Sequence, residues 1–459
     1  MTRLRWFPRP ALKRNEPAGD NSLRVSLRNL GLGMKKEGNH PIHEVLPCGI
    51  EYAVTPLIHR HVVSFQIRVL SGVCSEPADR LGLARMLAET IDKGTDQRTG
   101  KEVADAFDLF GASYTISAGR ETTTLACTVL PEHFDEAVAL NAEILRTPTI
   151  PQDAFEANLQ LTRQELLALD DDAQALTDKL ISRRAFGTVL GRHVLGEPES
   201  IEKTTRDDLV RHWRSHFHAG RMVVAVAGAV DPVRVAEVLQ KAFDGFGDSA
   251  PTGRKPYALE FSPGAVHYHK MLEQQQISLC FPGVEATHRD FPVQQVMIGV
   301  LAGGMSGRLF TEVREKQGLV YWVSAWQDTP RGAGMIFLGA STTAQRCDRT
   351  YATLLREIDR LTQDLEPEEL ERAKTGIIAQ FETRGDTTRA RCVELANDLL
   401  FFRKPVSVEE KVAKINAVTM NDMVRFLEDH PRQPRCVVTL GPRPLESVEI
   451  SEALSVPPS

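Results

Sequence analysis

The amino-acid sequence repeats one pattern at a distance of 214 positions, and this repeat constrains the fold more than any local signal does. The segment IEKTTRDDLVRHW, which begins at Ile201, aligns with INAVTMNDMVRFL, which begins at Ile415. The same shift places VVAVAG, from Val223, on VVTLGP, from Val437, and GLARMLA on VMIGVLA. Matches this far apart in a single frame predict two copies of one domain.

Each half has the same order of predicted elements. An alternating apolar pattern predicts a strand at 61–70, and further strands are expected within 113–130. The half closes with a short helix from Thr205 and the apolar strand MVVAVAG. Helices are expected over the segments 82–92, 101–110, 133–146 and 151–169. Because strands and helices are segregated, we predict an α+β fold with two homologous domains, each a mostly antiparallel sheet covered by helices.

The segment between the two halves has the composition of a linker. Residues 247–263 are rich in Gly, Pro and Ser. We therefore predict a first domain at 45–246 and a second domain at 264–446. Residues 1–44 and 447–459 are expected to be extensions without a core of their own.

Composition narrows the class of protein. The chain has 459 residues, of which 42% are hydrophobic and 25% charged, as in globular proteins. Its net charge of -6 comes from interspersed signs without a basic face, so we expect no nucleic-acid partner. No apolar run approaches the roughly 18 residues that a membrane span needs, so we expect no span.

We expect a cytoplasmic protein of a bacterial kind, with its seven scattered cysteines as buried thiols. The basic N-terminal stretch faintly resembles an organelle transit peptide. Pro8 and Pro10 interrupt any amphipathic helix there, which argues against an organelle matrix.

The stretch GLARMLAETIDKGT has the frame of a zinc-peptidase helix without its ligands. In the inverzincin motif H-x-x-E-H, two histidines share a zinc ion and the glutamate activates its water. In that frame Arg85 and Glu89 replace the histidines, and Ala88 replaces the glutamate. A protonated arginine ligates no cation and alanine is no base, so we expect no metal here. The alternative is a surface-facing helix on which Arg85 and Glu89 form a weak salt bridge.

Together these features resemble the pitrilysin-type (inverzincin) zinc peptidases, in the two-domain subgroup of mitochondrial processing peptidase. The resemblance extends over residues 45–445 and includes RQELLALDDD and GGMSGRLFTEVREKQGLVYWVSAW. It implies that Glu165, in RQELL, stands where the family has its third zinc ligand. Without both histidines we expect Glu165 to be a relic that holds no zinc.

Arg314 and Tyr321 are the candidate catalytic residues of the second half. We expect a helix capped by Ser306 and stopped at Gly318, followed by the strand LVYWVSAW, so that both side chains reach one cleft. In the resembled family an arginine and a tyrosine at this spacing bind the substrate carbonyl and the developing oxyanion. The structural alternative is that Arg314 complements a helix C-terminus and Tyr321 packs in a sheet.

Small members of the resembled family often work as heterodimers, in which one chain keeps the zinc motif and the other the Arg/Tyr pair. The resemblance therefore implies a non-catalytic subunit, inactive alone, that supplies Arg314 and Tyr321 to a zinc-bearing homologous partner that cleaves peptides. Zinc is expected in the partner and no cofactor on this chain. The strands at 112–129 either offer an edge to the peptide substrate or pair internally. The alternative function is structural assembly, as in the respiratory complex core proteins of this fold.

A cluster of histidines and a run of aspartates are better explained by structural roles than by metal binding. His212, His216 and His218 in HWRSHFH lie near a predicted helix end, and we expect no metal role for them. Asp170–Asp172 is expected to be a solvated loop after a helix.

Overall fold

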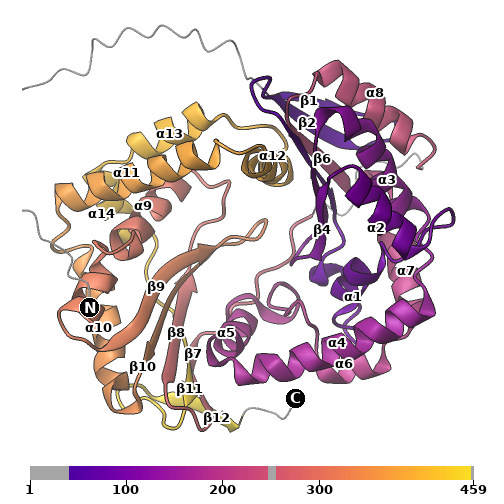
Figure 1. Cartoon of the computed structure of the whole chain (residues 1–459). Coiled ribbons are helices and arrows are strands. Elements are labelled where there is room, and N and C mark those ends of the chain that lie inside the picture. Colours follow the sequence, from indigo (N-terminus) through magenta and orange to yellow (C-terminus); the bar gives the residue numbers. More distant parts are fainter. Residues whose placement is uncertain (1–40, 247–254, 456–459) are drawn as a thin grey trace, which may run out of the picture. The chain divides into compact units, whose positions relative to one another are not determined.

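Two six-stranded sheets, one in each half of the chain, form the framework of the protein (Figure 1). The computed structural model describes residues 41–246 and 255–455. Most of the predicted N-terminal extension, the first part of the predicted linker and the end of the tail lie outside the described residues. The predicted α+β class, with mostly antiparallel sheets and helices, is confirmed.

The first sheet has the strand order β1-β2-β6-β3-β5-β4. Its strands are β1 (Ile42–Val45), β2 (Glu51–Pro56), β3 (Val63–Val69), β4 (Ser113–Ala118), β5 (Thr123–Val129) and β6 (Met222–Gly228). Only β2 and β6 pair in parallel, and the other neighbours are antiparallel. Strand β4 is an edge, and its side chains alternate between exposed and half-buried.

The second sheet has the order β12-β7-β11-β8-β10-β9. Its strands are β7 (Gly264–His269), β8 (Gln275–Pro282), β9 (Val320–Asp328), β10 (Met335–Thr342), β11 (Cys436–Gly441) and β12 (Ile450–Ser455). Apart from the added edge strands β1 and β12, its order repeats that of the first sheet. The structure therefore confirms the duplication. Both predicted extensions contribute an edge strand, because β1 pairs with β2 and β12 pairs with β7.

The helices follow the same order in both halves. The first half contains α1 (Leu83–Thr90), α2 (Gly100–Leu109), α3 (Phe134–Arg146), α4 (Gln152–Asp171), α5 (Ala173–Leu190), α6 (Pro198–Lys203), α7 (Arg206–His216) and α8 (Pro232–Phe243). The second contains α9 (Phe291–Ala302), α10 (Cys347–Arg360), α11 (Pro367–Arg384), α12 (Thr388–Phe402), α13 (Val408–Asn416) and α14 (Met420–Asp429). A short π-helix, η4 (Phe310–Glu315), precedes β9.

A repeated helix start explains the strongest internal match of the sequence. The Thr205 hydroxyl accepts a hydrogen bond from the Asp208 N–H, and the Asp208 carboxylate accepts one from the Thr205 N–H. Thr419 and Asp422 form the same capping box at α14. Such a box satisfies two N–H groups that the first helical turn leaves free, so its spacing is retained in both copies.

Each sheet is covered on both faces, and one cover comes from the other half of the chain. On β6, Met222, Val224 and Val226 face the core of the first half, whereas Val223 and Ala225 pack against α12. Conversely, α5 packs on the second sheet, where a cluster joins its apolar side chains to the strands: Ile181, Ala185, Phe186, Leu190, Cys280, Phe337 and Val438. Neither α5 nor α12 was predicted from the sequence pattern. The two halves thus exchange covering helices.

Ion pairs and part of the linker also connect the two halves of the chain. Arg120 donates from both terminal nitrogens to Asp328, at 2.7 and 2.6 Å. Arg331 Nε donates to Glu121 Oε1 at 2.9 Å. Tyr257, from the predicted linker, packs against the apolar cluster beneath α5. We retain 247–263 as the proposed domain boundary. In the described part of the chain, no helix is long and apolar enough to cross a membrane.

Candidate functional site

Arg85 fills the zinc-motif region of α1 with its own positive charge. Its side chain is 14% exposed and points towards α4, where Nη2 lies 2.8 Å from Glu165 Oε1 and 2.6 Å from Oε2. The same guanidinium donates to Thr162 Oγ1 at 3.3 Å and lies 3.9 Å from Glu89 Oε1. The Arg85–Glu89 salt bridge of the alternative interpretation is present, but Arg85 does not face the surface, and Glu165 is its closer partner.

The position of the motif's glutamate holds no base. Ala88 is 2% exposed and carries no proton-accepting group. Glu165 lies within α4, and its carboxylate faces the guanidinium of Arg85. A guanidinium remains protonated and has no lone pair to offer a metal, so it neutralises the carboxylates without activating water.

Glu76 holds the start of α1, and the sequence analysis missed it. Its two carboxylate oxygens accept hydrogen bonds from the N–H groups of Gly82, at 2.9 Å, and Ala84, at 2.7 Å. Gly82 has φ of 103°, which favours glycine, and a Cβ there would lie 2.6 Å from Ile201. The capping residue lies six positions before the bonded glycine, which is outside the usual N-cap spacing. Burial raises the pKa of Glu76 to about 7.

This raised pKa predicts that stability falls as the pH increases. The folded chain holds the Glu76 proton more tightly than the unfolded chain, whose carboxyl has its ordinary pKa near 4.5. The contribution is complete below about pH 4.5 and is lost as the pH rises through about 7. We expect the free energy of unfolding of wild type, relative to Glu76→Gln, to fall by about 3 kcal/mol across this window. Urea denaturation of both proteins over a pH series measures it.

Substitution of the exposed Glu428 by Gln controls for the loss of a carboxylate as such. Parallel pH profiles for wild type and Glu76→Gln would contradict the assignment of the proton to Glu76.

The structure brings Arg314 and Tyr321 together. The Arg314 guanidinium carbon lies 4.9 Å from the centroid of the Phe310 ring and 5.5 Å from that of the Tyr321 ring. Tyr321 is 77% exposed, and Arg314 is also open to solvent. Contact with two rings orients a guanidinium while its N–H groups, which point outwards in the guanidinium plane, can still donate hydrogen bonds. The pair thus presents hydrogen-bond donors to the surface.

The helix that carries Arg314 differs from the predicted one. It begins at Arg308, continues as the π-helix η4, and has no cap from Ser306. Gly318 ends it with φ of 58°, as its position predicted. In η4 the N–H of Lys316 bonds to the carbonyl of Thr311, five residues back, at 2.9 Å. A π-helix is rare and often marks a functional site.

A cleft of about 650 Å³ opens beside Tyr321. Its lining contains two carboxylates and several amides but no lysine or arginine: Ala168, Asp171, Asp172, Ala173, Gln174, Gln274, Gln276, Tyr321, Trp322 and Ser341. The run EQQQ at 273–276 was the available signal for Gln274 and Gln276, because alternate residues of an extended segment share a face; Gln276 lies in β8, and Gln274 directly precedes that strand.

The expected loop at Asp170–Asp172 is wrong. Helix α4 runs to Asp171, and Asp172 Oδ1 caps α5 by accepting hydrogen bonds from the N–H groups of Gln174 and Ala175. The direct passage from α4 to α5 places Asp171 and Asp172 at the wall of the Tyr321 cleft.

Two groups of possible metal ligands have other partners. His212 Nε2 lies 3.0 Å from Ser71 Oγ, and burial lowers its pKa to about 3, so His212 is a neutral core residue. In the described ranges, one triad of His288, Asp290 and His430 has ligand atoms within 4.8 Å of one another. The Asp290 carboxylate already faces Arg425, at 3.3 Å, and the neighbouring Arg289, at 3.5 Å. We assign this triad to an ion-pair cluster.

Comparison with known proteins places these features in a family. A model described as "Insulinase (Peptidase family M16)" matches residues 54–198, which include the altered motif. A second, described as "Peptidase M16 inactive domain", matches residues 203–377, which include Arg314 and Tyr321. The chain belongs to peptidase family M16.

The M16 relatives cover most of this chain. An uncharacterized zinc protease of Rickettsia bellii is 26% identical over 80% of this chain and 89% of its own length. The uncharacterized zinc protease YmxG of Bacillus subtilis is 25% identical over 80% of this chain and 91% of its own length. A solved structure described as a peptidase M16 inactive domain from Pseudomonas fluorescens has a TM-score of 0.81 at 18% identity. It covers 89% of this chain and 100% of that chain, which shows a common fold.

The inactive-domain match fits a chain that holds no zinc in its own motif, although its relatives are named zinc proteases. It is also consistent with a pseudoenzyme-like member of the M16 family.

Proposed function

We propose that this M16 chain is the non-catalytic subunit of a heterodimeric zinc endopeptidase. One observation carries the proposal: Arg85 neutralises the altered zinc motif, while Arg314 and Tyr321 lie together and exposed. The partner is a homologue with an intact H-x-x-E-H motif, whose zinc polarises the carbonyl and activates water when bound. This chain contributes hydrogen-bond donors to that active site. We place the complex in the cytoplasm.

The chemistry of the pair suits an oxyanion. Peptide hydrolysis places negative charge on the carbonyl oxygen, and both the Arg314 guanidinium and the Tyr321 hydroxyl donate hydrogen bonds. Each such donor typically contributes about 2.7–4 kcal/mol to the transition state in a site without water. In the isolated chain water surrounds both side chains and screens them. The partner would exclude this water, which accounts for a requirement for both subunits.

Two surfaces of the chain suit an extended peptide. Strand β4 pairs with β5 along one side, and along the other it offers its main-chain groups as a sheet edge. A peptide that adds to such an edge satisfies its main-chain groups without a sequence requirement. The amides of the Tyr321 cleft supply further donors and acceptors. Peptides are therefore the proposed substrate.

Reconstitution tests the proposal directly. The purified chain should show no chelator-sensitive peptidase activity, because Ala88 provides no base and Arg85 no ligand. Mixed with a homologue that bears H-x-x-E-H, it should produce cleavage of an unstructured peptide above the background of either chain, followed by mass spectrometry. The same mixture with chelator is the control.

Two outcomes would count against this function. Chelator-sensitive cleavage by the chain alone would show an active centre of its own. Assembly with the homologue without any change in cleavage would favour the structural assembly role.

A further inference from the structure

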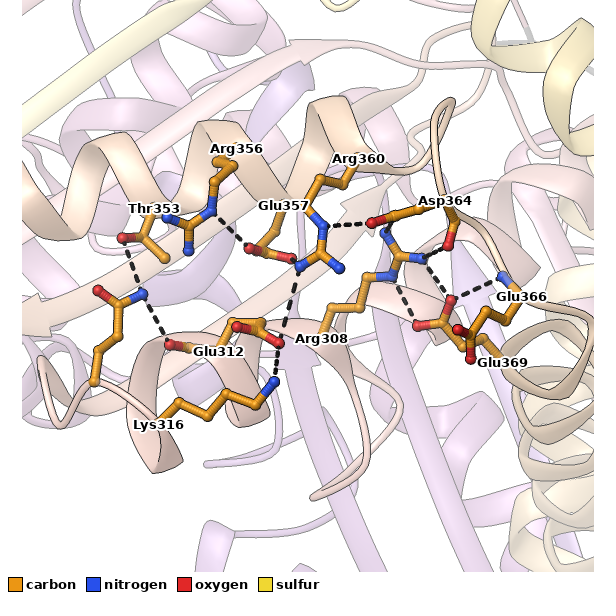
Figure 2. A network of polar contacts seen from close by, with 11 residues as sticks. Arg308, Glu312, Lys316, Thr353, Arg356, Glu357, Arg360, Asp364, Glu366 and Glu369 are labelled. Carbon is orange, nitrogen blue, oxygen red and sulfur yellow. Dashed lines mark hydrogen bonds and ion pairs between the residues drawn. The ribbon is translucent and has the colours of Figure 1, made fainter.

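Arg308 lies at the centre of a polar network beneath the helix that carries Arg314 (Figure 2). The Arg308 side chain is 6% exposed. It donates hydrogen bonds to the Glu369 carboxylate of α11, from Nε to Oε1 at 2.7 Å and from Nη2 to Oε2 at 2.5 Å. Its remaining donors reach the Asp364 carboxylate, at 2.9 Å, and the Asp364 carbonyl, at 3.0 Å. Burial alone would lower the pKa of Arg308, but Glu369 and Asp364 outweigh it and raise the pKa.

A second set of contacts joins η4 itself to α10. Glu312 pairs with Lys316 at 2.7 Å and lies 3.9 Å from Arg360. Arg360 also donates to Glu357, which is fully buried, at 2.8 Å, and to Asp364 at 2.7 Å. The Gln317 amide bonds to the Glu312 carbonyl. Figure 2 shows these contacts as one chain from Glu369 to Lys316, so η4 is tied to α11 through Arg308, which precedes it, and to α10 through Glu312.

The network encloses a backbone segment that is unusual in itself. A π-helix is rare, and it occurs mostly as a single turn within an α-helix, often at a functional site. Within η4, Arg314 lies two positions after Glu312, and its exposed guanidinium meets the rings of Phe310 and Tyr321. A relaxation of this segment to an α-helical turn would change the direction in which Arg314 points.

We infer that Arg308 is a positioning residue: through its contacts with Glu369 and Asp364 it holds η4 so that Arg314 remains against Tyr321. The inference rests on the proposed function of Arg314. A two-point guanidinium–carboxylate contact fixes orientation as well as distance, which a single ammonium does not. Displacement of a catalytic group by about 1 Å can cost about a hundredfold in rate.

A double-mutant cycle in the reconstituted heterodimer tests the inference. The four proteins are wild type, Arg308→Gln, Arg314→Ala and the double variant, and kcat and KM are measured for each. Arg308→Gln should lower kcat by about 10- to 100-fold with KM changed by less than about twofold. In the Arg314→Ala background it should lower kcat by less than about threefold, because the group that it positions is already absent.

Arg443→Gln is the matched control. Arg443 belongs to the same half and pairs with Asp348, at 3.1 Å, and with Glu446, at 3.4 Å, neither of which lies in η4. It should leave kcat within about twofold of wild type. Rates are compared at a temperature at which circular dichroism shows every variant folded. If Arg308→Gln fails to fold, Glu369→Gln weakens the same contact from the other side and replaces it in the cycle.

The outcomes separate this inference from the proposed function. Equal losses from Arg308→Gln in both backgrounds would show a purely structural role and overturn the inference, and so would an unchanged kcat. If Arg314→Ala itself leaves kcat unchanged, the proposed function of Arg314 is refuted, whatever the effect of Arg308→Gln.

Discussion

Replacement of Arg314 by Ala, or of Tyr321 by Phe, should lower kcat of the reconstituted heterodimer by about one to three orders of magnitude. Both changes remove a donor that bonds to charge present mainly in the transition state, so KM should change much less than kcat. Peptide cleavage under saturating substrate measures the effect. Because Arg314 also stacks on Tyr321, the double variant should lose less than the product of the two single losses.

Met305→Ala is a suitable control for these two variants. Met305 is exposed in the neighbouring loop, and its removal should leave kcat unchanged. Full activity in both Arg314→Ala and Tyr321→Phe would refute the oxyanion role and favour structural assembly.

Restoration of the zinc motif is expected to have a comparably large effect. The triple variant Arg85→His, Ala88→Glu, Glu89→His rebuilds H-x-x-E-H and removes the guanidinium that now faces Glu165. Two imidazoles and the released Glu165 carboxylate form the three-ligand set of a catalytic zinc site. We expect one more zinc ion per chain than in wild type, by metal analysis after dialysis.

The Arg85→His, Glu89→His double variant controls for the base, since it should gain the zinc but no hydrolysis. It also avoids a larger side chain at the buried position 88. Adding Glu165→Gln should weaken zinc binding by at least about 10- to 100-fold. Loss of a residue that only hydrogen-bonds to a metal ligand already costs this much, and Glu165 would be a ligand itself. If neither variant gains zinc, Glu165 does not occupy the place of a third ligand.

The sequence contained enough to predict the repeated architecture. Apolar strands such as MVVAVAG and the capping boxes at Thr205 and Thr419 are local signals, and they recur at the same spacing. The proximity of Arg314 and Tyr321 was also predictable, because one tight turn at Gly318 joins the helix to the strand. Local geometry therefore fixed one side of the candidate site.

The features that were missed depend on contacts between distant segments. Helix α5 contains a non-helical residue, Gly187. The apolar side chains of α5 are buried against strands of the other half. The pairing of Arg85 with Glu165 joins two helices, and a helical pattern alone favoured its i,i+4 neighbour Glu89. The carboxylates that bind Arg308, just before η4, lie 56 and 61 positions further along the chain.

The exchange of α5 and α12 has a consequence for how the molecule holds together. Each sheet has one face whose cover is encoded in the opposite copy, so a copy produced alone would present a broad apolar surface to water. A single copy would need a second chain to shield that surface. In the duplicated chain each copy carries the helix that covers the other, and the Arg85–Glu165 ion pair, with no need of a metal, links α1 to α4.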